Sequence, residues 1–444
     1  MNELGVFDDV RDAIKAAYEA QKILMRDYTT EDRDRFIKNI KRRYLEIIDE
    51  ETVNEFNETG YGRLDDKLMK NRASIDDTMG TEALEPNVMA SSKGLTVEYR
   101  APYGLVGALT PVTNGLPTVA CNTITMIAAG NSVVFNAHPA GKVAAAKAVD
   151  MINKAIVEVG GPENLATMAR IPTTETLDEI MKSPMVSLLI GTGGEQMVEM
   201  LMSSHKKVIA AGPGNPPSII DETADVKLAA KTLYTNVPIE NNMLCITEKV
   251  AFVVEDVYDE FVNEMISLGA RLLKDDEVEK VVAASLHQDE RGKYTANKTM
   301  VGRDANVVLK NAGVEPSEGD LRLAIIKADK DNPFVACEQM MPIFPIVKVK
   351  DFAEAVELAV KAEGGCRHSA AIWSNNLARI TEFGKRIDTA CFVQNGCTAA
   401  AAGMGGTGTG STTIATGTGE GFTNPATFTR VRRFAMAGGG GYIM

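Results

Sequence analysis

Cys245 is the residue whose type and surroundings best suit covalent chemistry in this chain. It lies in the run Asn-Asn-Met-Leu-Cys-Ile-Thr-Glu-Lys at 241–249, between two stretches that predict separate α/β domains. A cleft between domains is a common place for a small-molecule site, and cysteine is an intrinsically strong nucleophile. Taken by itself, the pattern still favours a buried structural cysteine, because free cysteines usually pack as small apolar side chains.

The other cysteines predict neither disulfides nor a metal centre. Six cysteines are spread along the chain, none of them in a C-x-x-C arrangement, and only four histidines are present. Zinc sites need closely spaced ligands, and disulfide frameworks need clustered cysteines in a secreted chain. We therefore expect no metal and a reducing, cytoplasmic setting, since the acidic N-terminus shows no secretory signal.

Charge and composition exclude two further classes of partner. The 444 residues carry a formal net charge of −13, with 45% hydrophobic and 24% charged residues, as in ordinary globular proteins. A broad acidic field repels phosphate backbones, so we expect no nucleic acid. The most apolar stretch, 118–135, is interrupted by Asn122, Asn131 and several threonines, so we expect no membrane span. An anionic cofactor must then bind to local backbone N–H groups.

Hydrophobic periodicity predicts two α/β series. An amphipathic helix at 7–25 and a helix-rich region to about residue 90 precede a strand at 93–100 and a short apolar run at 105–109. Short β-rich runs then alternate with helical stretches, which is typical of a parallel sheet. The first series has predicted strands at 132–135, 186–190 and 207–211 and helices at 142–159 and 195–202. The second has strands at 249–254, 345–349 and 369–373 and helices at 257–273, 352–362 and 377–387.

One segment outside these series, 399–419, is dense in Ala, Gly and Thr. It predicts either a flexible surface loop or a loop that closes over a ligand, where glycine permits close backbone approach. The sequence leaves both interpretations open.

Several short segments, taken in order, share the motifs of one enzyme superfamily. Residues 107–114 (GALTPVTN) form a strand that ends in a Pro-x-Asn-like motif with one extra residue. Residues 128–135 (AAGNSVVF) form an alanine–glycine–asparagine turn and strand, and 338–342 (EQMMP) a glutamate motif. The further matching segments are 191–194, 224–226, 419–423 and 428–430. In this order and spacing they resemble the aldehyde dehydrogenase superfamily over nearly the whole chain.

Departures from the hydrolytic members favour one branch of that superfamily. Hydrolytic members have a Glu-Leu-Gly-Gly run whose glutamate activates the deacylating water, and Ala211 stands in its place here. Water attacks a thioester poorly without a base, whereas a thiol needs less help. The segments 211–215 (AGPGN) and 135–139 (FNAHP) also resemble CoA-acylating aldehyde dehydrogenases. The similarity is greatest to the acetaldehyde and propionaldehyde enzymes of bacterial microcompartments.

The resemblance implies a mechanism and the residues that perform it. Cys245 is implied as the nucleophile and Asn114 as a donor to the oxyanion, with a turn-forming role for Asn114 as the alternative. NAD is implied as the hydride acceptor and coenzyme A as the acyl acceptor. The residues implied to contact the cofactor are Thr110, Pro111, His138, Pro139, Gly191, Thr192, Gly193, Gly194, Ala211, Gly212 and Glu338.

Alternatives stay open for some of these residues. Glu338 is either a contact to the nicotinamide ribose or a surface carboxylate, and Thr192 and Gly193 either face the cofactor or only form a tight turn. His138 replaces part of a lysine-containing segment of the hydrolytic relatives, so its contact with the cofactor is open. His368 is expected to be structural rather than a general base.

The resemblance also implies an aldehyde dehydrogenase-like α/β fold of two Rossmann-like domains with a β oligomerisation arm. We expect an NAD-binding domain at 1–90 and 104–232 and a catalytic domain at 233–418. The arm and C-terminal segment are expected at 91–103 and 419–444. Exposed pairing strands usually find a partner subunit, so we expect a homodimer or a dimer of dimers.

The expected reaction is the reversible oxidation of propionaldehyde or acetaldehyde, with NAD⁺ and CoA, to acyl-CoA and NADH. The alternatives are a CoA-dependent succinate-semialdehyde dehydrogenase, a hydrolytic enzyme, and a non-catalytic assembly protein of the same fold. Ala211 argues against the hydrolytic enzyme, and the retention of Cys245 and Asn114 argues against the non-catalytic protein. The resemblance further implies a place inside a bacterial microcompartment, with its shell as a partner.

Overall fold

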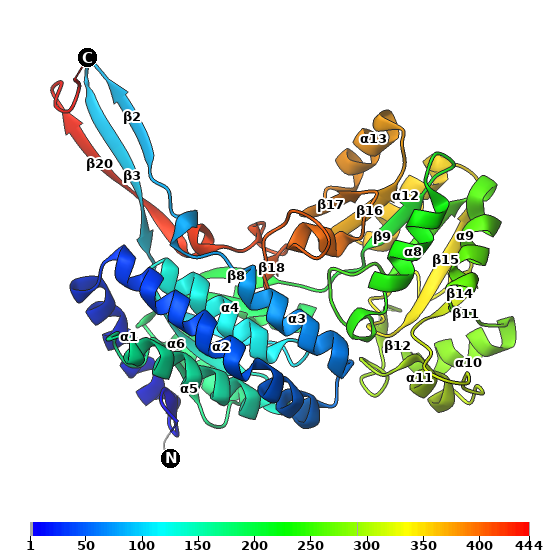
Figure 1. The fold of residues 1–444 in the computed structure, drawn as a ribbon, viewed down its shortest axis with the longest axis horizontal. Helices are drawn as coiled ribbons and strands as arrows, with labels where there is room; N and C mark the ends of the chain where they lie inside the picture. Colours follow the sequence, from blue (N-terminus) through cyan, green and yellow to red (C-terminus); the bar gives the residue numbers. More distant parts are fainter. Residues whose placement is uncertain (1–2, 291, 444) are drawn as a thin grey trace. The chain divides into compact units, whose positions relative to one another are not determined.

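The structure, a computed structural model, describes residues 3–290 and 292–443 and divides into two compact units. Unit 1 comprises Met1–Thr59, Lys70–Ala211 and Gly410–Met444, and unit 2 comprises Gly60–Met69 and Gly212–Thr409. Figure 1 shows the helices and strands of each unit.

Unit 1 is built on a six-stranded parallel sheet of order β1-β6-β5-β4-β7-β8. From β4 the chain continues outward through β5 and β6, and it then crosses to the other side of β4 for β7 and β8. Ligands of open α/β sheets bind outside the carboxyl ends of the strands at such a reversal. The strands are β1 (Val6–Phe7), β4 (Leu105–Thr110), β5 (Ser132–Ala137), β6 (Ala166–Ala169), β7 (Val186–Thr192) and β8 (Lys207–Ala211).

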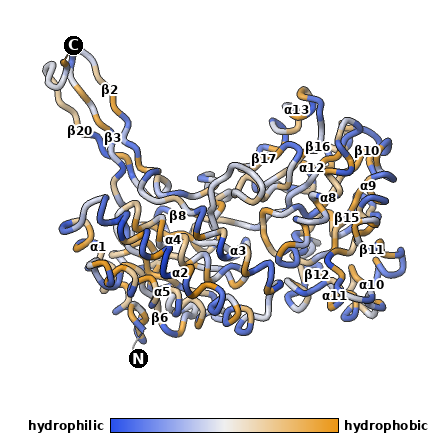
Figure 2. Tube along the Cα trace, viewed as in Figure 1, coloured by the Kyte–Doolittle hydropathy of each residue, from blue (hydrophilic) through white to orange (hydrophobic). Residues whose placement is uncertain are grey.

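Helices cover both faces of this sheet, so its strands are apolar along most of their length. Leu105 and Leu109 pack with α1 (Val10–Asp27) and α6 (Thr174–Lys182), whereas Val106 and Ala108 pack with the opposite layer. That layer contains α2 (Thr30–Thr59), α4 (Gly115–Ala128) and α5 (Lys142–Glu158). Helix α2 is coloured mainly hydrophilic in Figure 2, as suits a helix that packs on α4 and α5 with solvent on its other side.

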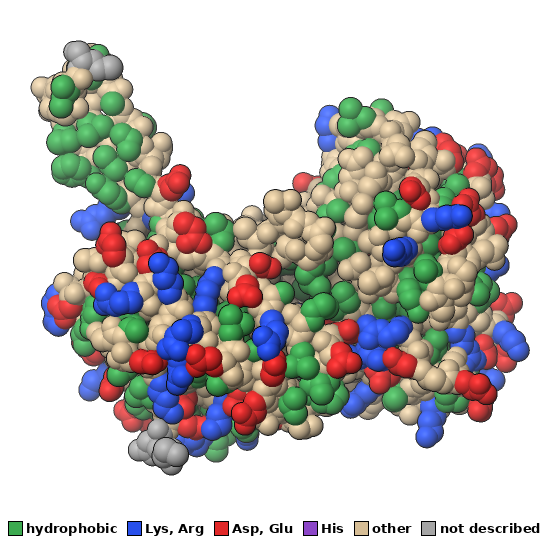
Figure 3. Space-filling view, viewed as in Figure 1, with side chains coloured by type: hydrophobic (Ala, Val, Ile, Leu, Met, Phe, Trp, Pro, Cys, Tyr) green, Lys and Arg blue, Asp and Glu red, His purple; other side chains and the backbone are tan. Residues whose placement is uncertain are grey.

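An antiparallel three-stranded sheet, here called the arm, extends from unit 1 (Figure 1). It consists of β2 (Asn87–Ser91), β3 (Gly94–Pro102) and β20 (Thr429–Ala437). The register places a mainly apolar set on one face, namely Val88, Ala90, Leu95, Val97, Tyr99, Phe434 and Met436, with Arg432 opposite Tyr99 on the same face. The opposite face carries polar groups, including an ion pair between Arg433 and Glu98 at 2.6 Å. Figure 3 shows hydrophobic side chains gathered along the arm.

Unit 2 is built on a seven-stranded parallel sheet of order β11-β14-β15-β10-β9-β16-β17. Its strands are β9 (Pro217–Ile220), β10 (Val250–Val254), β11 (Arg271–Leu272), β14 (Ala324–Ala328), β15 (Ile343–Val349), β16 (Ser369–Trp373) and β17 (Cys391–Gln394). Helices α8 (Val226–Asn236) and α9 (Glu255–Ser267) cover one face. The other face is covered by α10 (Asp275–Ser285), α11 (Ala305–Asn311), α12 (Phe352–Glu363) and α13 (Leu377–Ile387).

Short elements complete the chain. The remaining α-helices are α3 (Leu64–Asp76) and α7 (Glu195–Met202). The remaining strands are β12 (Leu286–Gln288), β13 (Tyr294–Ala296), β18 (Ile414–Ala415) and β19 (Gly421–Phe422). The 3-10 turns are η1 (Thr81–Ala83), η2 (Pro139–Gly141), η3 (Ile239–Asn242), η4 (Thr398–Ala402) and η5 (Pro425–Phe428).

The predicted α/β class with two parallel sheets is confirmed, and differences are confined to boundaries. The helix predicted at 257–273 ends at Ser267, because Gly269 takes a φ of 110° and the chain then enters β11. Strand β9 pairs with β10, and the segment Gly212–Thr409 lies in unit 2, whereas the sequence predicts the change of domain at 232. The arm begins at Asn87 rather than at residue 91.

Within the described ranges, no helix is long and apolar enough to cross a membrane. Among the same residues, no group of three or more His, Cys, Asp or Glu side chains is arranged to hold a metal ion.

Candidate active site

The residues of unit 1 that are predicted to contact the cofactor lie at the carboxyl ends of the strands, here called the carboxyl edge of the sheet. They end or follow β4, β5, β7 and β8, which are neighbours in the order β5-β4-β7-β8. The carboxyl ends of these strands therefore meet beside the reversal between β4 and β7. The residues brought together are Thr110, Pro111, His138, Pro139, Gly191, Thr192, Gly193, Gly194 and Ala211.

Two features of this edge fit an anionic dinucleotide such as NAD. The buried Thr110 hydroxyl has no hydrogen-bond partner among the described residues, and buried polar groups normally have one. Gly194 is the N-cap of α7, and a side chain placed there would meet nothing within 4 Å. Backbone N–H groups at an open helix N-terminus suit phosphate oxygens, so the edge fits the predicted cofactor. Gly212, the first residue of unit 2, likewise has open space around its missing side chain.

His138 has a local role at this edge. Its Nδ1 accepts a hydrogen bond from the Ala140 N–H at 3.2 Å and so caps the η2 turn, which begins at Pro139. This capping role accounts for a histidine before Pro139 even if the histidine contacts no ligand. Its predicted contact with the cofactor stays a prediction.

The Ala-, Gly- and Thr-rich segment is held by hydrogen bonds over its unit 1 part. Thr413 Oγ1 lies 3.1 Å from Thr192 Oγ1, and Thr418 Oγ1 accepts the Ala210 N–H at 3.0 Å. Ile414 and Ala415 are buried. Residues 410–419 therefore support the turns after β7 and β8 and are not a free surface loop.

In unit 2, the residues that could take part in chemistry lie just before strands of the sheet. Gly214 precedes β9, Cys245 precedes β10, Glu338 precedes β15 and His368 precedes β16. Because these strands are neighbours in the order β15-β10-β9-β16, the four segments meet at the amino edge of the sheet. A Cβ on Gly214 would lie 2.7 Å from the Cys245 carbonyl oxygen and 2.8 Å from His368 Cγ. Glycine is thus required for these segments to pack together.

Three consecutive left-handed residues lead the chain to Cys245. Glu240, Asn241 and Asn242 have φ values of 53°, 54° and 63°, and their side chains are buried. A non-glycine residue held in this conformation costs of order 1–3 kcal/mol and persists only when its surroundings fix it. The turn before the nucleophile therefore needs strong partners.

Residues 60–69 supply some of these partners. Glu240 forms a fully buried ion pair with Lys67, with Oε2 and Nζ 3.2 Å apart, and its backbone N–H donates to Asp66 Oδ2 at 3.0 Å. The Asn241 amide donates to the Gly302 carbonyl at 2.9 Å. Removing one partner from a buried ion pair costs about 3–5 kcal/mol, so this pair fixes the turn firmly.

Lys249 holds the Cys245 loop from the side of β10. Its Nζ donates to the backbone carbonyls of Asn242 at 2.7 Å and of Leu244 at 2.9 Å. Burial lowers the pKa of Lys249 to about 8, while the nearby Glu338 and Cys245 groups act in the opposite direction. Lys249 thus orders the loop and places a cationic group near the thiol.

The Cys245 side chain is partly exposed, whereas four of the six cysteines are buried. Burial raises the pKa of the Cys245 thiol to about 12, the Glu338 charge adds to the rise, and Lys249 opposes it. The pKa values of the other thiols are raised as well, to about 11 or 12. Cys366 is also partly exposed, so its place before β10, rather than exposure or pKa, distinguishes Cys245.

Two ionisable neighbours complete this edge. Glu338 is half-buried, which differs from a solvated surface carboxylate, and burial raises its pKa against the opposing effects of Lys249 and the Gly214 N–H. His368 is fully buried, with Nδ1 2.7 Å from Ser369 Oγ. Burial lowers the pKa of His368 to about 4, so the imidazole is neutral at neutral pH. His368 Nε2 is buried and has no hydrogen-bond partner among the described residues, and the structural role expected for His368 stays a prediction.

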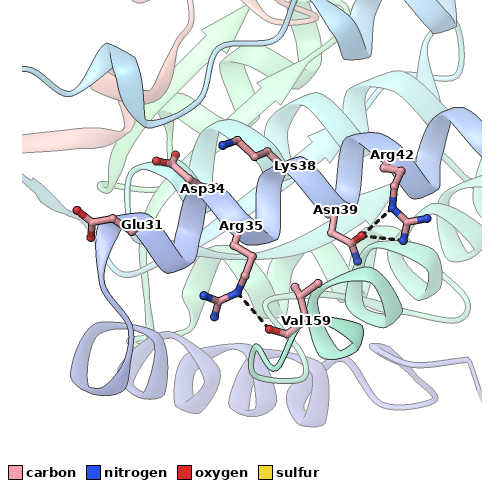
Figure 4. A pocket seen from close by; sticks show the side chains of 7 residues that line it. All are labelled: Glu31, Asp34, Arg35, Lys38, Asn39, Arg42 and Val159. Atoms are coloured by element: carbon pink, nitrogen blue, oxygen red, sulfur yellow. Dashed lines mark hydrogen bonds between the residues drawn. The ribbon is translucent and has the colours of Figure 1, made fainter.

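A surface pocket on α2 lies apart from all predicted site residues of unit 1. Figure 4 shows its lining residues, which are Glu31, Asp34, Arg35, Lys38, Asn39, Arg42 and Val159. Arg35 Nε donates to the Val159 carbonyl at 3.3 Å, and Arg42 donates to Asn39 Oδ1. Both arginines of the pocket are thus engaged within the surface, and none of the predicted site residues lines it.

Three lysines that hold these segments could not be identified from the sequence. Lys67 pairs with Glu240, Lys249 holds the Cys245 loop, and Lys70 donates to Asn114 Oδ1 at 2.6 Å. Lys67 and Lys70 lie three residues apart on α3, and this spacing in a charged helix predicts a solvent-exposed face. Only the contacts, which join segments distant in the chain, show that both lysines are buried.

Comparison with known proteins gives a consistent result. Residues 4–430 match the aldehyde dehydrogenase family. The chain is 40% identical over 435 residues to the acetylating acetaldehyde dehydrogenase EutE of Escherichia coli, covering 98% of this chain and 92% of that protein. A propionaldehyde dehydrogenase from the fucose utilisation microcompartment of Clostridium phytofermentans matches at 38% identity with a TM-score of 0.94, over 98% of this chain and 99% of that one. A Rhodopseudomonas palustris propionaldehyde dehydrogenase, solved with bound CoA and an acylated cysteine, matches at 34% identity with a TM-score of 0.94, over 99% of both chains.

The raised pKa of Cys245 predicts how the free thiol reacts. Because its pKa is about 12, the thiolate fraction, and with it alkylation by iodoacetamide, should rise about tenfold per pH unit from neutral pH to about pH 10. Glu338→Gln should accelerate alkylation, because the charge that raises the pKa is removed while an acceptor for the Gly214 N–H remains. Peptide mass spectrometry measures the rate at Cys245.

Glu248→Gln is the matched control. Glu248 is buried and lies three residues from Cys245, but its Oε1 accepts the Thr398 N–H, and it is not among the main causes of the Cys245 shift. A rate that levels off near pH 8.5, the ordinary cysteine range of about pH 8–9, would contradict the assigned environment. So would equal effects of the two substitutions.

Proposed function

Because the chain belongs to the aldehyde dehydrogenase family, we propose that it oxidises acetaldehyde or propionaldehyde, with NAD⁺ and CoA, to the acyl-CoA. The observation that carries the CoA-dependent assignment is Ala211, a buried methyl side chain at the end of β8, where hydrolytic relatives have their catalytic glutamate. The relatives named above, with their acetylating activity and their acylated cysteine beside CoA, support the same assignment.

The proposed first step is addition of the Cys245 thiolate to the aldehyde carbon. A carbon–sulfur bond forms, and the carbonyl π electrons move to oxygen, which becomes an oxyanion. The Asn114 amide N–H and the Cys245 backbone N–H donate hydrogen bonds to this oxyanion. Each such donor is worth about 10²–10³ in rate.

The cofactor edge of unit 1 serves the second step. When bound, NAD⁺ accepts the hydride that leaves the former aldehyde carbon, so that a thioester remains on Cys245. Gly191, Thr192, Gly193 and Gly194 would hold the pyrophosphate, and Thr110 and Pro111 line the same edge. His138, Pro139, Ala211, Gly212 and Glu338 are the further residues proposed to contact the cofactor.

The final step is acyl transfer. The CoA thiolate attacks the thioester carbon, the acyl group passes to CoA, and the Cys245 thiolate is released. Water competes poorly, because Ala211 offers no base to deprotonate it. This difference between thiol and water as acceptor favours the acylating enzyme over the hydrolytic alternative.

Omission of CoA should separate the two half-reactions. Enzyme, NAD⁺ and propionaldehyde should give a burst of NADH of about one equivalent per active site followed by a slow phase, since thioester hydrolysis lacks a base. Added CoA should start steady turnover and yield propionyl-CoA. Stopped-flow absorbance at the NADH band and chromatography of the products measure both.

Cys245→Ala should abolish both the burst and the turnover but retain NAD binding. Cys366→Ala is the matched control, because Cys366 is also partly exposed and precedes a strand of the same sheet. It should keep both phases. Sustained formation of free propionate at the CoA-dependent rate would overturn the acylating assignment.

We propose that the apolar face of the arm binds a second copy of the chain. Val88, Tyr99 and Phe434 on this face are 56%, 49% and 53% exposed. Exposed apolar strands of this kind normally pair or pack with a partner. A homodimer or dimer of dimers follows, and the microcompartment origin of one relative supports a place in such a compartment.

A charge on the apolar face should dissociate the oligomer. Phe434→Glu buries a carboxylate at the proposed interface, whereas Val431→Glu places the same group on the opposite face at similar exposure, 57% against 53%. Size-exclusion chromatography with light scattering should show a smaller particle for Phe434→Glu only. Unchanged mass for Phe434→Glu would remove the arm from the interface.

A further inference from the structure

Asn114 occupies a position where asparagine ordinarily has a structural task. It is the N-cap of α4, and an N-cap asparagine usually accepts a hydrogen bond from the second or third backbone N–H of its helix. Here the Asn114 side chain makes no such bond. The Asn114 side chain therefore does not perform the turn-forming role that the sequence left open.

Glu55 on α2 performs the capping task instead. Its Oε1 accepts the N–H of Leu116, the second residue of α4, at 2.8 Å, and the Glu55 side chain is 1% exposed. The helix N-terminus is thus satisfied from a neighbouring helix, and the Asn114 amide is released from it. Such a carboxylate also interacts favourably with the positive end of the helix dipole.

Lys70 on α3 fixes the orientation of the Asn114 side-chain amide. Its Nζ donates to Asn114 Oδ1 at 2.6 Å, and Lys70 is 6% exposed. An ammonium group only donates, so it must face the amide oxygen and never the amide nitrogen. Asn114 Nδ2 is therefore directed away from Lys70.

We infer that Lys70 is a positioning residue, which fixes the Asn114 amide with its N–H groups toward the oxyanion. The inference rests on the proposed function, in which Asn114 is that donor. Lys70 is not proposed to touch the substrate. Its charge-assisted bond to the amide oxygen also polarises the amide, which strengthens the N–H groups as donors.

A double-mutant cycle in kcat tests the inference on the full-length enzyme. Lys70→Met removes the cationic donor and should lower kcat about 10²-fold, near the loss for one oxyanion donor, with little change in KM. Asn114→Ala should lower kcat about 10²–10³-fold. The double variant should be no slower than Asn114→Ala, because both substitutions remove the same interaction.

Lys41→Met is the matched control. Lys41 is a partly buried lysine of unit 1 that donates to the Thr78 carbonyl at 2.7 Å, and it has no contact with Asn114. It should retain wild-type kcat. Alkylation of Cys245 should be unchanged in Lys70→Met, since the thiol lies in the other unit and the substitution acts on the oxyanion donor. Additive losses in the double variant, or wild-type kcat in Lys70→Met, would overturn the inference.

Asn114→Asp keeps the test decisive if Lys70→Met is not recovered folded. An aspartate preserves the oxygen that Lys70 binds but removes both N–H donors. Its melting temperature should equal or exceed that of the wild type, while kcat falls about 10²–10³-fold. Retained activity would overturn the inference. A wild-type enzyme that forms no acyl-CoA would instead refute the proposed function, which separates the two failures.

Discussion

The left-handed turn at Glu240, Asn241 and Asn242 is the constraint on which the nucleophile depends. Irregular backbone that is buried must find partners for every polar group, because each unsatisfied group costs free energy. The protein meets this requirement with side chains from two directions, the buried Lys67 ion pair and the Lys249 ammonium group on the loop carbonyls. Cys245 is thereby held in one position without lying in a helix or strand.

The two sheets use opposite edges for their chemistry. In unit 1 the residues predicted to contact the cofactor gather at the carboxyl ends of the strands, beside a reversal of strand order. In unit 2 the thiol, Glu338 and His368 gather at the amino ends. In both units a buried lysine donates to a backbone or amide oxygen and thereby orients the group beside it, Lys249 for the Cys245 loop and Lys70 for the Asn114 amide.

Much of the fold and part of the site could be predicted from the sequence. Strands β8 and β16 and helices α7 and α13 have the predicted bounds, because local periodicity and flanking glycine or asparagine determine them. Cys245 and Asn114 required the resemblance between ordered motifs, since a lone cysteine or asparagine is not distinctive. Lys67, Lys70 and Glu55 could not be predicted, because their importance lies in burial and in partners far along the chain. The unit that begins at Gly212 depends on the pairing of β9 with β10, which local periodicity does not show.

The central claim is that the acyl group passes through a thioester on Cys245. Intact-protein mass spectrometry after incubation with NAD⁺ and propionaldehyde, without CoA, measures this species directly. The account predicts a mass gain of one propionyl group, located at Cys245 by peptide mapping and discharged within one turnover when CoA is added. An unmodified Cys245 in an enzyme that has formed NADH, or a stable adduct that CoA does not discharge, would contradict it.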